Sequence, residues 1–101
     1  MSPVRREVSF VQVQTVQLVL FSSAFCGPCM QTRTVLEEAA RLIPGASFAD
    51  LDVVAHVDEA EAEGIEATPT VLIRNAAGAE VFRAEGAPSL NQVLVAAAKA
   101  L

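Results

Sequence analysis

The sequence contains no tryptophan or tyrosine, and among its 101 residues there are only two cysteines and one histidine. Five phenylalanines are its only aromatic residues, which argues against base-stacking platforms and aromatic cages for ligands. Basic residues are also scarce, with seven Lys and Arg against twelve Asp and Glu and no basic run, which argues against a nucleic-acid partner. Chemistry beyond that of carboxylates must therefore use the cysteines or the histidine.

Long apolar runs are missing as well. Arg5 and Arg6 precede an apolar stretch from Val8 to Phe21 that superficially resembles a secretory signal. Polar residues interrupt this stretch, and its longest unbroken apolar run, Leu18 to Phe21, is far shorter than the roughly 20 residues of a membrane span. We therefore expect a cytoplasmic protein with no membrane partner. In that reducing compartment a lone cysteine pair is typically catalytic, redox-active or metal-binding.

The apolar fraction is large, at 52%, and is carried mostly by Ala, Val and Leu. At this length it predicts one domain with a packed core. Hydrophobic periodicity predicts a buried strand within residues 8–22, either one long strand or two segments with a bend near Thr15. A helix of about four turns follows from Pro28 and ends before Pro44.

The second half of the sequence also contains predicted strands and helices. Residues 48–54 are predicted to form a second buried strand that carries two acids, and residues 56–64 a short surface helix. Residues 70–74 and 79–83 form a predicted hairpin, and the final helix follows Ser89, with Gln92 completing a capping box. This order predicts an α/β protein with a parallel unit and an antiparallel hairpin in one mixed sheet.

The strongest chemical signal is Cys26-Gly27-Pro28-Cys29, because it lies where a buried strand meets the first turn of a helix. Unpaired N–H groups and the helix dipole favour a thiolate at that position, so we expect a lowered pKa for the Cys26 thiol. Cys26 would then attack a substrate disulfide, and Cys29 would resolve the mixed disulfide. Two alternatives stay open: an inert buried pair, and a zinc site, although zinc needs about four ligands and the chain offers three candidates.

Three segments, in this order, resemble the thioredoxin family. Phe25-Cys26-Gly27-Pro28-Cys29 matches the family's active-site motif, with phenylalanine where a tryptophan usually stands. Ala67-Thr68-Pro69-Thr70 is similar to the segment that contains the family's cis-proline, and the stretch from Gly86 to Ser89 is similar to its glycine-containing substrate loop. The resemblance extends over residues 18–101. It implies a thioredoxin-like fold, with a central mixed β-sheet flanked by helices.

The resemblance also implies substrate-binding residues, namely Phe25, Gly27, Pro28, Thr68, Pro69 and Gly86. A cis bond before Pro69 would turn the backbone of Thr68 outward, so that its N–H and C=O pair with an extended substrate strand. A trans proline that opens an edge strand is the alternative. Gly86 would let a substrate chain approach closely, although an ordinary loop glycine would look the same.

The sequence departs from the family near the active site. Typical members have a buried aspartate six positions before the first cysteine and a lysine nineteen positions before the cis-proline, and the two assist proton removal from the resolving thiol. Leu20 and Asp50 hold those places here. One hypothesis makes Asp50 catalytic: desolvated at a strand centre with no cationic partner, it accepts the proton of Cys29. The alternative is that Asp50 points to solvent at a strand edge.

Other departures concern Ser22, which replaces a second tryptophan, and Met30, which replaces a basic residue. Only 25 residues precede Cys26, too few for the family's usual first strand and first helix, so we expect that helix to be missing. Residues 1–14 are predicted to be an arm, an added strand or a dimer contact, and residues 15–101 the thioredoxin-like domain. The protein would be a monomer or a weak dimer through this segment, whose alternating Val and Gln could pair with a sheet edge.

These features together predict a thiol-disulfide oxidoreductase that reduces or exchanges protein disulfides through a Cys26/Cys29 dithiol cycle. Its substrates would be disulfide-containing proteins, and its electrons would come from a separate donor resembling thioredoxin reductase. No cofactor or metal is expected. The alternative is a redox-sensing or partner-binding module of the same fold with little general reductase activity.

Overall fold

The computed structural model describes residues 15–101. Its elements are β1 (Val16–Ser22), α2 (Gly27–Leu42), β2 (Ser47–Asp52), α3 (Val57–Ala62), β3 (Thr70–Asn75), β4 (Glu80–Glu85) and α4 (Leu90–Ala98). This order confirms the predicted sequence of strands and helices. The predictions for residues 1–14, including the arm, the dimer contact and the missing N-terminal helix, lie outside the described residues.

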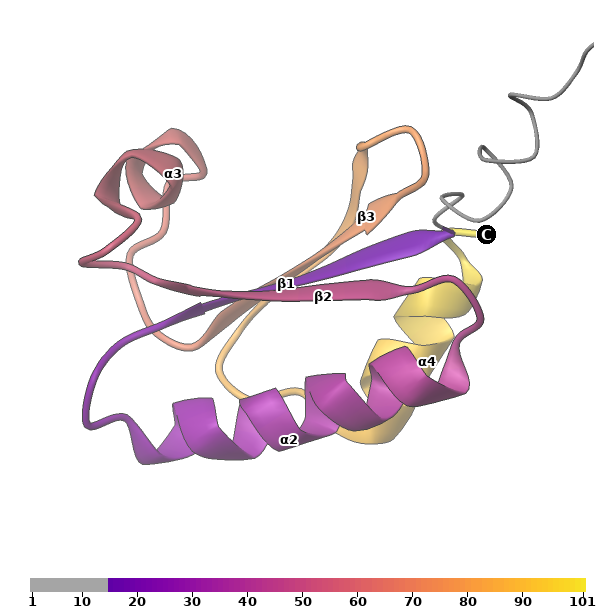
Figure 1. Ribbon diagram of the computed structural model, residues 1–101, viewed down its shortest axis with the longest axis horizontal. Helices are drawn as coiled ribbons and strands as arrows, with labels where there is room; N and C mark the ends of the chain where they lie inside the picture. Colours follow the sequence, from indigo (N-terminus) through magenta and orange to yellow (C-terminus); the bar gives the residue numbers. More distant parts are fainter. Residues whose placement is uncertain (1–14) are drawn as a thin grey trace, which may run out of the picture.

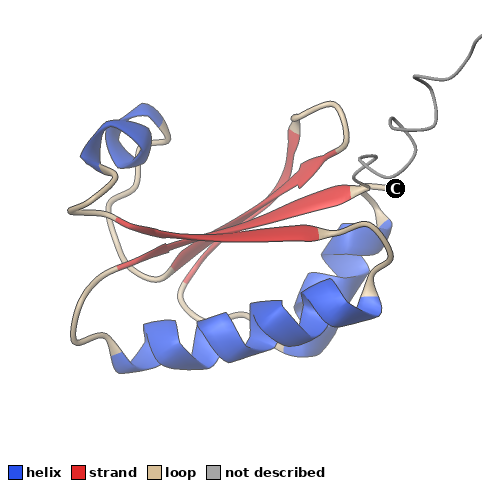
Figure 2. Ribbon diagram, in the orientation of Figure 1, coloured by secondary structure: helices blue, strands red, loops and turns tan. Residues whose placement is uncertain are grey.

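The four strands form one mixed sheet in the order β2-β1-β3-β4. Strands β1 and β2 are parallel, whereas β3 is antiparallel to both β1 and β4. Helices α2 and α4 cover one face of the sheet, and α3 lies over the other (Figures 1 and 2). The expected α/β architecture, a parallel unit followed by an antiparallel hairpin, is therefore confirmed.

Strand β1 supplies both cores because its side chains alternate between the two faces. Leu18 and Leu20 point toward α2 and α4, where they join a cluster that includes Leu36 of α2 and Val93 of α4. Val19 and Phe21 point the other way, into a smaller cluster beneath α3. A strand that is apolar on both faces must lie inside a sheet, which explains the central place of β1.

Strand β2 is shorter than the sequence suggests. It ends at Asp52, so the prediction that Val53 and Val54 continue the strand is wrong. The prediction of a buried strand is also wrong, because β2 is an edge strand and none of its residues is fully buried. The strand ends early because of the Asp52 carboxylate, whose Oδ1 accepts the backbone N–H groups of Val54 at 2.8 Å and Ala55 at 3.2 Å. A side chain that bonds the backbone two residues onward forms a turn in place of a strand. The turn leads the chain into α3.

Candidate active site

The two cysteines lie at the junction between strand β1 and helix α2, as predicted. The strand ends at Ser22, and α2 begins at Gly27 with Cys26 as its N-cap in extended conformation. The Cys26 sulfur accepts the backbone N–H of Cys29 at 3.1 Å, which is the bond of an N-cap side chain. Pro28 lies in the first turn, where its missing N–H leaves no partner unsatisfied. The helix terminus therefore directs an N–H group at the first sulfur.

Cys26 and Cys29 are joined by a disulfide across Cα atoms 5.2 Å apart. The two residues differ in exposure: Cys26 is partly exposed, whereas Cys29 is only 1% exposed. A substrate disulfide outside the protein can therefore reach the first sulfur but not the second. This asymmetry suits a pair in which one cysteine attacks and the other resolves.

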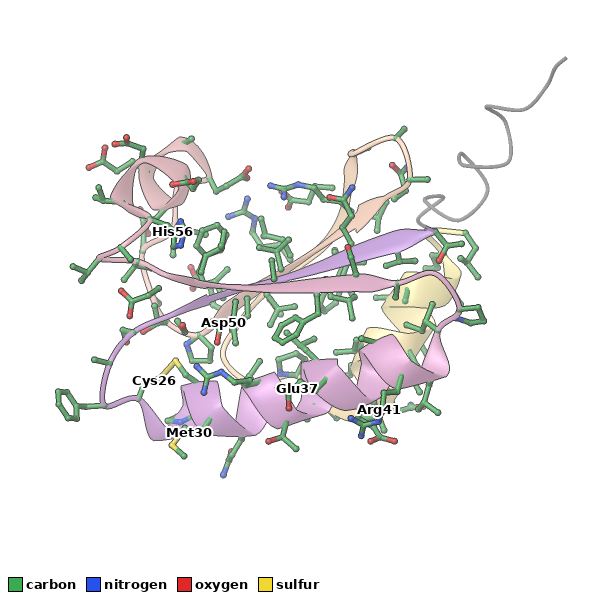
Figure 3. All side chains as sticks on the ribbon, viewed as in Figure 1. Cys26, Met30, Glu37, Arg41, Asp50 and His56 are labelled. Atoms are coloured by element: carbon green, nitrogen blue, oxygen red, sulfur yellow. A yellow bond between two sulfur atoms is a disulfide. The ribbon has the colours of Figure 1, made fainter. Side chains whose placement is uncertain are left out.

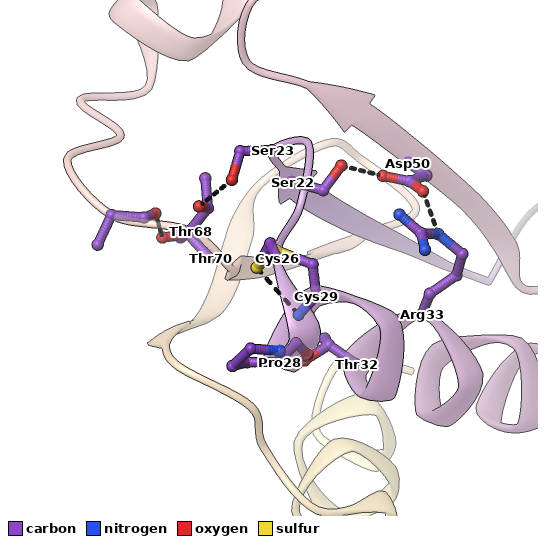
Figure 4. The surroundings of a disulfide bond; sticks show 11 residues. Ser22, Ser23, Cys26, Pro28, Cys29, Thr32, Arg33, Asp50, Thr68 and Thr70 are labelled. Carbon is purple, nitrogen blue, oxygen red and sulfur yellow. Dashed lines mark hydrogen bonds and ion pairs between the residues drawn. A yellow bond between two sulfur atoms is a disulfide. The ribbon is translucent and has the colours of Figure 1, made fainter.

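Two loops from the second half of the sequence lie against this junction. The Thr68–Pro69 peptide bond is cis, and the Thr68 hydroxyl shares a 2.7 Å hydrogen bond with the hydroxyl of Ser23, in the loop before Cys26. Gly86 donates its backbone N–H to the Pro69 carbonyl at 2.8 Å and has a φ of +97°, a conformation that favours glycine. Three segments that are distant in sequence thus meet at one end of the sheet. Figure 4 shows the contact between Ser23 and Thr68 beside the disulfide.

The predicted substrate-binding residues of the motif lie at the surface. Phe25 is fully exposed and has a φ of +57°, and Gly27 and Pro28 are exposed beside it. Pro69 is buried, and Thr68 is partly exposed. An exposed aromatic side chain next to a reactive sulfur offers apolar contact to an incoming chain. The structure brings all six predicted binding residues to the same end of the molecule as the disulfide.

Asp50 has a different environment from the one proposed from the sequence. It lies on the edge strand β2, and its side chain keeps 27% exposure. Ser22 donates its hydroxyl to Asp50 Oδ1 at 2.7 Å, and Arg33 donates Nε to Oδ2 at 2.5 Å. The premise that Asp50 is desolvated and lacks a cationic partner is therefore wrong, because helix α2 supplies a guanidinium. Asp50 nevertheless faces α2, on the side of the sheet that carries the cysteines (Figure 3).

A pocket of about 500 Å³ opens beside the disulfide. Its wall includes Cys26, and its polar part is formed by Asp50, Arg33 and the two serines at the end of β1. The small side chain of Ser22 leaves this space open. Met30 lines the same pocket and is 65% exposed, so it lies at the rim and not in the core.

Arg33 is the site residue that sequence reasoning missed. It lies four residues after Cys29 on α2, and residues at this spacing share one face of a helix. The signal was thus present: the face of α2 that carries the buried cysteine also carries a cation one turn later. Without the strand register, nothing in the sequence placed Asp50 opposite it.

Within residues 15–101, no group of three or more His, Cys, Asp and Glu side chains is arranged to hold a metal ion. In the same part of the chain, no helix combines the length and the apolar character needed to cross a membrane.

Comparison with known families and curated proteins gives a consistent result. The family model described as Thioredoxin matches residues 6–99. A "Thioredoxin H-type" from Oryza sativa subsp. indica is 38% identical over 72 residues, which cover 71% of this chain and 58% of the rice protein. A "Thioredoxin" from Chlamydia muridarum is 36% identical over 69 residues, covering 68% of this chain and 67% of its own. The matched segment thus spans little more than half of the rice relative.

Solved structures show the same similarity in three dimensions. A thioredoxin from Nicotiana alata superposes with a TM-score of 0.75 at 27% identity, covering 98% of this chain and 87% of its own. Chloroplastic thioredoxin z superposes with a TM-score of 0.76 at 25% identity, with coverages of 98% and 89%.

Proposed function

Because the chain belongs to the thioredoxin family, we propose that it is a thiol-disulfide oxidoreductase that reduces or exchanges disulfides in proteins through Cys26 and Cys29. The observation that carries the proposal is the unequal exposure of the two joined sulfurs at the start of α2. Cys26 is open to a substrate and held at the helix terminus, while Cys29 lies buried within bonding distance.

The reaction starts from the reduced protein. The Cys26 thiolate attacks one sulfur of a substrate disulfide and forms a mixed disulfide, and the other substrate sulfur leaves as a thiolate. Cys29 then loses its proton, and its thiolate attacks the Cys26 sulfur. The second substrate thiol leaves, and an internal disulfide forms. Two electrons have passed to the substrate, and the structure, with its Cys26–Cys29 bond, corresponds to this oxidised end state.

The helix terminus favours the first step. The N–H group of Cys29 points at the Cys26 sulfur, so a negative charge on that sulfur meets a donor and the positive end of the helix dipole. The substrate chain would run past Phe25 and between the Thr68–Pro69 and Gly86 loops. The backbone of Thr68 would pair with it, and Gly86 has no side chain to hold it away.

Asp50 is proposed as the acceptor of the Cys29 proton. It lies on the α2 side of the sheet and lines the pocket that Cys26 also lines. Its two bonded donors occupy one lone pair on each oxygen, which leaves further acceptor capacity on the carboxylate. The proton passes from the buried thiol to this carboxylate, directly or through a water molecule.

Insulin reduction in the presence of dithiothreitol tests the activity. We expect the native protein to accelerate precipitation of the insulin B chain above the uncatalysed rate, and Cys26→Ser to abolish the acceleration. When reduced Cys29→Ser is mixed with the substrate and dithiothreitol is left out, a mixed disulfide at Cys26 should accumulate, visible by mass spectrometry. A native protein that stays at the uncatalysed rate would favour the alternative, a redox-sensing or partner-binding module.

The direction of electron flow depends on the reduction potential of the pair. Equilibration with glutathione should give a value near about −270 mV for a reductase, whereas about −120 to −180 mV would indicate an oxidase or isomerase. We propose a reductase that works in the cytoplasm and is itself reduced by a donor resembling thioredoxin reductase. Reduction of the Cys26–Cys29 bond by such an enzyme and NADPH, followed as NADPH consumption, tests that partner.

A further inference from the structure

A hydrogen-bonded chain of three side chains crosses the layer between the sheet and α2, next to the redox pair. Ser22 comes from the end of β1, Asp50 from β2 and Arg33 from the second turn of α2. Each carboxylate oxygen of Asp50 has its own donor, the hydroxyl at 2.7 Å and the guanidinium at 2.5 Å (Figure 4). The position of Asp50 is thus fixed from two sides.

The strand register explains why this arrangement faces the disulfide. Leu20 and Asp50 pair across β1 and β2, and Ser22 pairs with Asp52. Because side chains two residues apart share a face, Ser22 follows Leu18 and Leu20 toward α2. The apolar layer between sheet and helix therefore ends in a polar row, and the pocket beside Cys26 opens there.

Ser22 and Arg33 differ in what they contribute. Ser22 is 4% exposed and neutral, so it acts as a fixed donor. Arg33 carries a charge at a side chain that keeps 36% exposure. Asp50 lies on an edge strand, where an unpaired carboxylate would turn toward solvent and away from the helix. Ser22 holds Asp50 to β1, and Arg33 is the residue that joins it to α2.

We propose that Arg33 is a positioning residue that acts through Asp50: the guanidinium of Arg33 holds the carboxylate of Asp50 against α2, in the pocket that Cys26 also lines, for the step in which Cys29 loses its proton. This inference rests on the proposed function and on the proposed role of Asp50. Under this proposal, α2 and its N-cap provide the two reacting sulfurs, and α2 also provides the cation that orients the proton acceptor of Cys29.

Rapid mixing of the reduced full-length protein with a disulfide peptide, followed by acid quench, alkylation and mass spectrometry, separates the two steps. The mixed disulfide forms at Cys26 and decays as Cys29 attacks. We expect Arg33→Gln to slow the decay about tenfold, less than the roughly hundredfold or more for complete loss of a general base because Asp50 itself is retained, and to leave the formation rate unchanged. Arg33→Lys should restore most of the rate because it keeps the charge. Arg41→Gln, which removes a guanidinium near the other end of α2, is the matched control and should change neither step.

A double-mutant cycle tests whether Arg33 acts through Asp50. Asp50→Asn should slow the decay at least as much as Arg33→Gln, and the double variant should be no slower than Asp50→Asn. The inference is wrong if Arg33→Gln leaves the decay rate unchanged, if its effect persists in the Asp50→Asn background, or if Asp50→Asn has no effect on the decay. Each of those results leaves disulfide reduction by the native protein intact, whereas absence of that reduction would overturn the proposed function itself.

Discussion

The two faces of the sheet carry very different amounts of apolar core. The face under α2 and α4 has twelve buried residues in one cluster, drawn from two strands, two helices and the residues just after those helices. The face under α3 has four: Val19, Phe21, Ala60 and Leu72. The cysteines belong to the helix that is anchored on the larger core. The helix that begins at the reactive sulfur is therefore anchored on the larger of the two apolar clusters in the described structure.

The smaller face has polar contacts in addition to its apolar cluster. Glu63, which follows α3, forms ion pairs with Arg74 of β3 and Arg83 of β4. Arg83 also donates to Glu80 and to the Glu63 carbonyl, so the end of α3 is joined to two strands. Partly exposed ion pairs contribute less than buried apolar surface. We expect this face to be the weaker one.

Matched leucine truncations should give the largest difference in stability between the two faces. Leu36 on the α2 face and Leu72 on the α3 face are both fully buried. Leu36→Ala should lower the free energy of unfolding by about 4 kcal/mol, and Leu72→Ala by about 2 kcal/mol, because the short α3 can settle into the smaller cavity. Urea unfolding of the oxidised proteins measures both values. Equal losses would mean that the two faces are packed equally well.

Removal of the central acid on the α3 face is the next largest change. Glu63→Gln should cost about 1.5 kcal/mol, between the values for exposed and buried pairs, because it deprives two arginines of a partner. Glu61→Gln on α3 is the control, since Glu61 is exposed and forms no ion pair in the described part of the chain. If both variants unfold at the same urea concentration, the ion pairs do not contribute to this face.

The capping box of α4 offers a smaller test on the larger face. The Ser89 hydroxyl accepts the N–H of Gln92 at 3.1 Å, and the Gln92 side chain accepts the N–H of Ser89 at 2.8 Å. Ser89→Ala should cost about 1 kcal/mol, and Ser89→Asp should restore most of it. Thermal unfolding monitored by circular dichroism measures both. An unchanged midpoint for Ser89→Ala would show that packing alone holds α4 on the sheet.

The larger face is also the one that the sequence predicts best. Its helices are specified by local signals, namely the periodic apolar residues on α2, the helix end before Pro44 and the Ser89–Gln92 capping box. Signals of this kind can be recognised in the sequence alone. The position of Cys26 at a helix terminus follows from the same signals. What escaped prediction depends on contacts between segments far apart in the chain.

Two residues show why the rest could not be predicted. The turn at Asp52 depends on a side chain competing with the strand for backbone N–H groups, and strand propensity does not include that competition. The partner of Asp50 depends on the register between β1 and β2 and on how α2 packs against them. Together these place Arg33 Nε 2.5 Å from Asp50 Oδ2. Periodicity places a residue on a face but does not say which charge lies opposite.

The smallest expected effect concerns Glu80, at the outer edge of the weaker face. Arg83 donates Nε and Nη2 to the two carboxylate oxygens of Glu80, each at 2.9 Å, and these hydrogen bonds lower the pKa of Glu80 below its ordinary value of 4.5. A lowered folded pKa means stability that is present above the unfolded pKa and is lost as pH falls through the folded pKa. Glu80 is largely exposed, so solvent screening should leave only a few tenths of a kcal/mol. Carboxyl NMR should show the Glu80 titration moving to higher pH in Arg83→Gln; a Glu80 midpoint that stays in place would remove this pair from the contacts that hold the α3 face.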